Sequence, residues 1–314
     1  MRNRVRRTTP WTADDIPDLP GCTAVVTGAT AGLGLATARM LAERGARVIL
    51  ACRNIEKAIK AAQLIRRSAP AADLPIVPLD LASQQSVRTA AARVRTECDR
   101  VDLLINNAGT LIRHRTRTED GFETTFATNH LGPFAFTGLL LDLLRAAPAG
   151  RVVTVSSGSA TFKTALDLED LSYQHREYRP LRVYGASKLA NLLFTFELQR
   201  RLNGTAVRSL AAQPGLARTD FGYNMGAVLR FLNQPRNRWL TDWMMQSPDM
   251  GALPTLRAAV DPTACGGDFY GPPNGRLRGY PTHNQPTATA DDPHLAAALW
   301  ARSQELTGVT YTFD

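Results

Sequence analysis

Tyr184 and Lys188 lie four residues apart near the middle of the chain, a spacing that suits proton transfer. On a helix, side chains at positions i and i+4 project from the same face. A free phenol has a pKa of about 10 and exchanges protons poorly near neutral pH. A nearby ammonium group favours the phenolate and so lowers the pKa of the phenol. The pair therefore predicts a tyrosine acid/base with a lysine beside it, although ordinary helix pairs often share this spacing.

Ser156 and Ser157 follow directly after an apolar run, Arg151 to Val155, that predicts a strand. Open parallel sheets bind their ligands at the carboxyl ends of the strands. A serine hydroxyl at such a place can hydrogen-bond a substrate oxygen on which negative charge develops. One of the two serines is therefore a candidate for the same site.

A glycine-rich turn lies near the N-terminus, between a predicted strand at 23–26 and a predicted helix at 33–43. Its three glycines let the backbone turn sharply and approach a diphosphate, and the helix N-terminus offers unpaired N–H groups. A tight turn without a ligand is the alternative. The position of the turn at the head of a βαβ unit favours a dinucleotide. The predicted contacts are Thr27, Gly28, Thr30, Ala31, Gly32, Leu33 and Gly34.

The elements that would position these residues follow from an alternation of short β-branched runs with longer amphipathic stretches, which is typical of βαβ units. The pattern predicts an α/β fold: a single-domain, doubly wound parallel sheet of the Rossmann type with helices on both faces. Further strands are predicted at 47–51, 76–79, 101–105, 151–155 and 207–211, and a final short one at 269–270. Helices are predicted at 55–68, 83–98, 130–146, 183–202, 254–260 and 291–306, and 271–286 is predicted as a loop.

The order of these motifs resembles the short-chain dehydrogenase/reductase family. The glycine spacing is G-x-x-x-G-x-G, as in that family, and the resemblance covers roughly Gly21 to Asp220. It implies hydride transfer between a nicotinamide and a carbonyl or alcohol carbon, with Tyr184 moving the proton. The other matches are, in order, Asp80-Leu81, Asn106-Asn107-Ala108-Gly109, Ser156-Ser157, Tyr184 with Lys188, and Pro214-Gly215.

The resemblance also implies a role for each matching residue. Ser157, the second serine, would bond the substrate oxygen, and Lys188 would also bond the nicotinamide ribose. Asn129 would help to hold a water that links the lysine to solvent. The other implied cofactor contacts are Asp80 and Leu81 near the adenine, Asn107, Ala108 and Gly109 on the adenosine side, Pro214 and Gly215, and Thr219 at the nicotinamide carboxamide.

The end of the second predicted strand bears on the choice of cofactor. In family members that bind NAD, an acidic residue near this point bonds the adenosine ribose and would repel a 2′-phosphate. Here Cys52 stands at about that position and Arg53 follows it. A guanidinium can pair with a phosphate through two charge-assisted hydrogen bonds. The sequence therefore predicts NADP(H) as cofactor, with a surface arginine in a loop as the alternative.

The substrate side resembles the retinol-dehydrogenase-like branch of the family. The stretch between Ser157 and Tyr184 is long and contains Asp167-Leu-Glu-Asp-Leu171, and Leu-Ala-Asn follows Lys188. Residues 221–250, which carry aromatic and methionine side chains, occupy the place of a substrate lid. Apolar residues there predict a lipophilic carbonyl or alcohol substrate. A pair of core-packing helices is the alternative reading of the same residues.

Composition narrows the function further. The chain has 314 residues and a formal net charge of +9, almost all of it from arginine. No nucleic-acid motif accompanies this charge, so no nucleic-acid partner is expected. The cysteines and histidines form no ligand pattern, which predicts no metal site. No apolar stretch is long enough to cross a bilayer, and the protein is expected to be cytoplasmic.

The sequence predicts residues 1–20 as a basic N-terminal tail and 21–314 as the oxidoreductase domain. Family relatives often pair through their long helices, so a homodimer or homotetramer is expected by analogy. Two other functions stay open. One is a sugar-nucleotide epimerase or dehydratase of the extended family. The other is a catalytically idle NADPH-binding sensor or scaffold.

Overall fold

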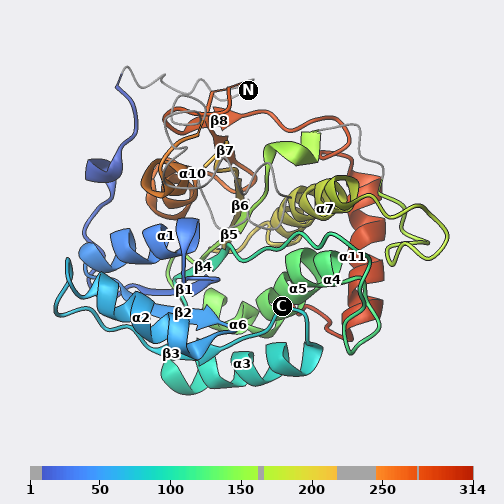
Figure 1. The fold of residues 1–314 in the computed structure, drawn as a ribbon. Coiled ribbons are helices and arrows are strands. Elements are labelled where there is room, and N and C mark those ends of the chain that lie inside the picture. Colours follow the sequence, from blue (N-terminus) through green and yellow to red (C-terminus); the bar gives the residue numbers. More distant parts are fainter. Residues whose placement is uncertain (1–8, 162–165, 218–244, 274–275, 314) are drawn as a thin grey trace, which may run out of the picture.

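The structure, a computed structural model, describes residues 9–161, 166–217, 245–273 and 276–313. Its centre is an eight-stranded sheet with the order β3-β2-β1-β4-β5-β6-β7-β8 (Figure 1). Neighbouring strands are parallel except for the last pair, β7 and β8, which is antiparallel. The strands are β1 (Thr23–Thr27), β2 (Arg47–Cys52), β3 (Ile76–Pro78), β4 (Leu103–Asn106), β5 (Arg151–Val155), β6 (Arg208–Ala212), β7 (Phe269–Gly271) and β8 (Thr282–Asn284).

Helices cover both faces of the sheet, as the sequence predicts. One face packs against α1, α2 and α10. The other packs against α3, α5, α6, α7 and α11. The helices are α1 (Gly32–Glu43), α2 (Ile55–Ile65), α3 (Gln84–Glu97), α4 (Thr124–Phe126), α5 (Gly132–Leu139), α6 (Leu141–Arg145), α7 (Pro180–Arg201), α10 (Pro248–Val260) and α11 (Pro293–Thr307), with a π-helical turn η2 (Ala127–Leu131) between α4 and α5.

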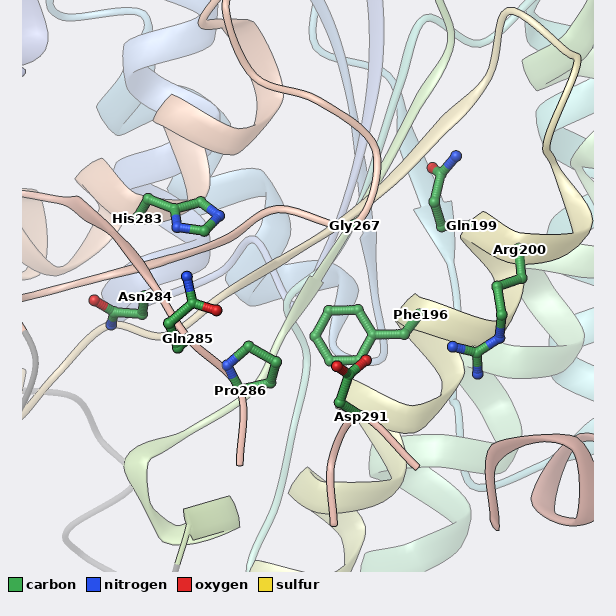
Figure 2. A pocket seen from close by; sticks show the side chains of 9 residues that line it. All are labelled: Phe196, Gln199, Arg200, Gly267, His283, Asn284, Gln285, Pro286 and Asp291. Atoms are coloured by element: carbon green, nitrogen blue, oxygen red, sulfur yellow. The ribbon is translucent and has the colours of Figure 1, made fainter. Parts of the chain in front are cut away.

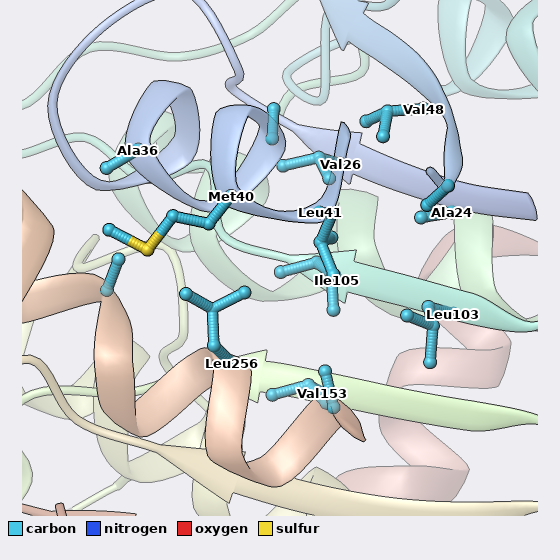
Figure 3. Close-up of a cluster of buried hydrophobic side chains, with 14 of the residues drawn as sticks. Ala24, Val26, Ala36, Met40, Leu41, Val48, Leu103, Ile105, Val153 and Leu256 are labelled. Atoms are coloured by element: carbon cyan, nitrogen blue, oxygen red, sulfur yellow. The ribbon is translucent and has the colours of Figure 1, made fainter. Parts of the chain in front are cut away.

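The strand sequences explain why the sheet is buried on both sides. Successive side chains of a strand point to opposite faces. In β1, Ala24 and Val26 belong to the α1/α10 core, whereas Val25 belongs to the opposite core. Figure 3 shows the first of these cores, where Leu41 of α1 and Leu256 of α10 lie beside strand side chains. A parallel sheet of this kind reads as continuous apolar runs because both of its faces are covered.

The prediction of one helix at 130–146 is wrong about where the helix begins and about its being continuous. Helical structure begins at Thr124 and is interrupted at Leu140, which joins α5 to α6. Glu123 caps the start, because its carboxylate accepts hydrogen bonds from Thr125 N (2.8 Å) and Phe126 N (2.7 Å). Glutamate is not among the preferred capping residues, so the sequence carries no clear start signal there.

The prediction of a loop at 271–286 is wrong in part, because β8 lies within this range and pairs with β7. β8 is short, polar and at the edge of the sheet, so no apolar run marks it. The helix predicted at 254–260 begins earlier, at Pro248, where Ser247 caps it by accepting from Met250 N. Pro254 therefore lies inside α10.

The packed part of the chain also begins before residue 21. Trp11 and Ile16 are buried in the α1/α10 core. At the other end, α11 covers part of α5 and α7, where Trp300 packs on Phe134 and Phe194. Within the described residues, none of the helices is long and apolar enough to cross a membrane.

Candidate active site

The glycine turn after β1 is built so closely that side chains would not fit. Gly28 and Gly32 have φ values of 68° and 54°, which glycine adopts without strain. A Cβ atom at Gly34 would lie 2.4 Å from the Gly28 carbonyl oxygen and 2.5 Å from Asn107 Nδ2. No side chain caps the N-terminus of α1 at Ala31. A diphosphate fits this arrangement, because a helix N-terminus presents N–H groups to an anion. Thr30, Ala31 and Leu33 are partly exposed in the same turn.

Thr27 joins this turn to the loop after β4. Its hydroxyl accepts hydrogen bonds from Asn107 N and Ala108 N, both at 3.0 Å, and Asn107 Nδ2 donates to the Thr27 carbonyl at 2.8 Å. These residues shape two adjoining loops at the carboxyl edge of the sheet. The hydroxyl of Thr27 and the side-chain amide of Asn107 are therefore engaged in hydrogen bonds within the protein.

We expect Gly34→Ala to weaken cofactor binding at least ~10-fold, because the added methyl group meets backbone atoms that must move, at a cost of about 1–3 kcal/mol. Gly158→Ala is the matched control, since its Cβ atom would have ordinary contact, 3.6 Å from Gln213 Oε1. Titration of NADPH fluorescence measures both variants. Equal affinities would mean that the turn does not shape the site.

Tyr184, Lys188 and Ser157 lie together at the carboxyl end of β5. The Ser157 hydroxyl lies close enough to the Tyr184 phenol to lower the pKa of that phenol. Lys188 Nζ donates to the Val155 carbonyl at 2.9 Å and lies 5.8 Å from the centre of the Tyr184 ring. Ser156 is buried, and its hydroxyl donates to the Lys188 backbone carbonyl at 2.8 Å. Ser157 is thus the serine next to the Tyr184 phenol, whereas Ser156 hydrogen-bonds the backbone of α7.

Burial controls the ionisation of this pair. It raises the pKa of Tyr184 to about 12, while the nearby Ser157 hydroxyl acts in the opposite direction. It lowers the pKa of Lys188 to about 8. The lowering of the tyrosine pKa expected from the lysine is therefore not found in the protein alone. The reason is that loss of hydration disfavours the charged form of both groups.

Asn129 lies in the π-helical turn η2, a type of distortion that is frequent at functional sites. Its side-chain oxygen accepts from Thr110 N at 2.7 Å, and its amide donates to the Thr110 carbonyl and to the Ser187 hydroxyl, each at 2.9 Å. Both donors are therefore used inside the protein, so any water held by Asn129 must bond its oxygen atoms. His130 is buried in an aromatic cluster, and burial lowers its pKa to about 3.

Arg53 and Asp80 lie beside each other after the ends of β2 and β3. The Arg53 side chain is 78% exposed, with Nη1 3.9 Å from the Asp80 carboxylate. Cys52 is buried, and burial raises the pKa of its thiol to about 11. Cys52 itself therefore places no negative charge at the end of β2. Leu81 is buried, and its carbonyl lies against Gly132 of α5, where a Cβ atom would clash.

Pro214 and Gly215 follow β6 at the same edge. The Pro214 carbonyl accepts from Gln246 Nε2 at 2.5 Å, and Gly215 has a φ of 64°. Gln246 is buried and was not singled out from the sequence, since glutamine carries no motif there. Thr219 and positions 221–244 of the predicted lid lie outside the described residues.

A separate hollow of about 300 Å³ lies at the end of the sheet away from the carboxyl ends of the parallel strands (Figure 2). Gln199 and Arg200 line it from the end of α7, Gly267 from the turn before β7, and His283 from β8. It is therefore distinct from the Tyr184 site. Among the described residues, no cluster of histidine, cysteine or carboxylate side chains could hold a metal ion.

Comparison with known proteins identifies the family. A family model described as short chain dehydrogenase matches residues 22–168. Retinol dehydrogenase 13 of Homo sapiens is 39% identical over 93% of this chain and 86% of its own length. Polyprenol dehydrogenase of Mus musculus is also 39% identical, over 93% of this chain and 86% of its own length.

The crystal structure of an uncharacterised protein from Mycobacterium paratuberculosis is 40% identical and superimposes with a TM-score of 0.80, covering 97% of this chain and all of that one. Proteins of this family use a nicotinamide cofactor to act on alcohols and carbonyls. The chain therefore belongs to the short-chain dehydrogenase/reductase family, in its retinol-dehydrogenase-like branch.

Proposed function

We propose that this protein is an NADP(H)-dependent oxidoreductase that interconverts a lipophilic alcohol and its carbonyl compound, with Tyr184 as the acid/base. The observation that carries the proposal is the grouping of Tyr184, Ser157 and Lys188 at the carboxyl end of β5, where Lys188 Nζ lies 5.8 Å from the centre of the Tyr184 ring. The bound cofactor supplies the hydride in reduction and takes it up in oxidation.

The residues divide the remaining work. In reduction, the Tyr184 O–H donates its proton to the substrate oxygen, and the Ser157 hydroxyl hydrogen-bonds the same oxygen as charge develops on it. Lys188 stabilises the phenolate that results and bonds the nicotinamide ribose. The glycine turn holds the diphosphate, and Arg53 pairs with the 2′-phosphate.

A lipophilic substrate is supported by the relatives, two of which are named for retinol and polyprenol. Most of the lid predicted at 221–250 lies outside the described residues, and its last three residues belong to α10. The cytoplasmic location and the homodimer or homotetramer also remain proposals. Since α11 occupies the surface around Phe134 and Phe194, any pairing through α5 and α7 would have to use another part of these helices.

A panel of aldehydes and ketones of increasing chain length, monitored by NADPH absorbance, tests the proposal. Turnover that improves with chain length is the expected result. NADPH binding without turnover of any compound would favour the idle sensor. Conversion of a sugar nucleotide without net consumption of NADPH would favour the epimerase, although the glycine spacing speaks against it.

Lys188→Ala is expected to weaken NADPH binding as well as to slow turnover, because the proposal gives this side chain two roles. General acid–base and electrostatic contributions of this kind amount to ~10²-fold or more in rate. The dissociation constant for NADPH and kcat, measured on the same preparation, separate the two roles. Unchanged cofactor affinity would remove the contact with the ribose and leave only the effect on the phenol.

A further inference from the structure

Tyr178, which no step above uses, makes contacts that join three segments around the reaction site. Its hydroxyl lies 3.0 Å from the Ile112 carbonyl oxygen and 3.1 Å from Glu123 Oε1, and it can share its proton between these two acceptors. Ile112 belongs to the loop after β4, Glu123 begins α4, and Tyr178 lies just before α7. We propose that Tyr178 and Glu123 are positioning residues that hold the 110–112 segment beside the reacting atoms. This inference rests on the proposed function.

Glu123 is a carboxylate buried to 1% exposure, yet each of its oxygens has a defined partner. Oε1 accepts from Thr125 N and Oε2 from Phe126 N, so the carboxylate fixes the first turn of α4. α4 runs directly into the π-helical turn that carries Asn129. A movement of Glu123 would therefore be transmitted to Asn129 through the five residues of continuous helix between them.

The backbone of this segment is hydrogen-bonded by side chains from α7, α4 and the π-helical turn η2, or from just before them. Thr110 is bonded at both its N–H and its carbonyl by Asn129. Ile112 donates its N–H to the Thr125 hydroxyl at 3.3 Å and accepts at its carbonyl from Tyr178. Because the segment depends on these few bonds, loss of one of them frees a specific part of it.

This segment is close to the proposed reaction centre. A Cβ atom at Gly109 would lie 3.3 Å from Lys188 Nζ and 3.4 Å from Asn129 Oδ1. Tyr178 also precedes Tyr184 by only six residues, and α7 begins between them at Pro180. The Tyr178 hydroxyl thus links the start of the helix that carries Tyr184 and Lys188 to the loop that faces Lys188. The diphosphate turn and Arg53 share none of these contacts.

Removal of the link should therefore act on alignment of the substrate and leave the affinity for the cofactor unchanged. A misplacement of about 1 Å can cost on the order of 10²-fold in rate. We expect Tyr178→Phe to lower kcat about 10-fold or more, with the dissociation constant for NADPH within about twofold of the wild-type value. The isotope effect on kcat with stereospecifically deuterated NADPH should rise, because misalignment slows the chemical step.

Tyr173→Phe is the matched control. Its ring packs against that of Tyr178 with centroids 5.9 Å apart, and its hydroxyl makes no hydrogen bond within the described part of the chain. Glu123→Gln and Glu123→Ala form a second pair, since glutamine keeps an acceptor for Tyr178 and for one backbone N–H. Glu123→Gln should retain more of kcat than Glu123→Ala at equal cofactor affinity.

The outcomes separate this inference from the proposed function. If the wild-type protein reduces a carbonyl compound and Tyr178→Phe matches it in kcat and isotope effect, the positioning role is wrong while the function stands. A parallel loss of NADPH affinity and kcat in Tyr178→Phe would also overturn it, because that pattern indicates general loosening of the site. An inactive wild-type protein contradicts the proposed function itself.

Discussion

Tyr184→Phe should lower kcat at least ~10²-fold while leaving the affinity for NADPH almost unchanged, because it removes the proton donor and keeps the aromatic ring. Ser157 remains at the end of β5 in this variant, so the substrate can still bind. Steady-state kinetics on the best compound of the panel, together with NADPH titration, measure the two quantities. A Tyr184→Phe variant with near-normal turnover would show that the assigned mechanism is wrong.

The pH dependence provides an independent check on Tyr184. Because burial raises the pKa of its phenol to about 12, the phenol stays protonated through the neutral range and can donate in the reduction direction. Oxidation of the alcohol needs the phenolate, so its rate should rise as the pH rises towards that pKa. The rising limb should be absent in Tyr184→Phe. Tyr280→Phe, at a 43% exposed tyrosine, serves as the control.

The second large effect concerns the choice of cofactor. Wild-type protein should bind NADPH about ten- to a hundredfold more tightly than NADH, because a charge-assisted hydrogen bond contributes on the order of 1.5–3 kcal/mol. The double variant Cys52→Asp/Arg53→Ala should reverse this preference. Its new carboxylate would repel the 2′-phosphate and accept hydrogen bonds from the ribose hydroxyls. Dissociation constants for the two cofactors, measured in both proteins, give the ratio directly.

The exposure of Arg53 sharpens this test. A guanidinium that is 78% exposed interacts through water as well as directly, so salt should weaken NADPH binding more than NADH binding. Arg66→Ala is the matched control, because Arg66 is an exposed arginine at the end of α2. Equal dissociation constants for NADPH and NADH in the wild-type protein would make Arg53 a bystander on the loop.

Most of the architecture could be predicted because its signals are local. Apolar runs at Thr23–Thr27 and Arg151–Val155 mark strands buried on both faces, and the glycines after β1 mark a turn that no other residue fits. The departures are found where a local signal is weak. Glu123 is an uncommon capping residue for a helix. β8 is a polar strand at the edge of the sheet, where it forms an antiparallel pair with β7.

The sequence by itself determined which chemical groups this protein has: a phenol and an ammonium on one helical face, two serines after a strand, and a glycine turn before a helix. Only the tertiary structure decided which serine meets Tyr184, and that Asn129 bonds Thr110. It also brought Tyr178 to Glu123, 55 residues away along the chain. The physical reason is that spacing along one element follows from local geometry, whereas contacts between elements depend on packing. The same packing removes water from Tyr184 and Lys188, so their pKa values are properties of the folded protein.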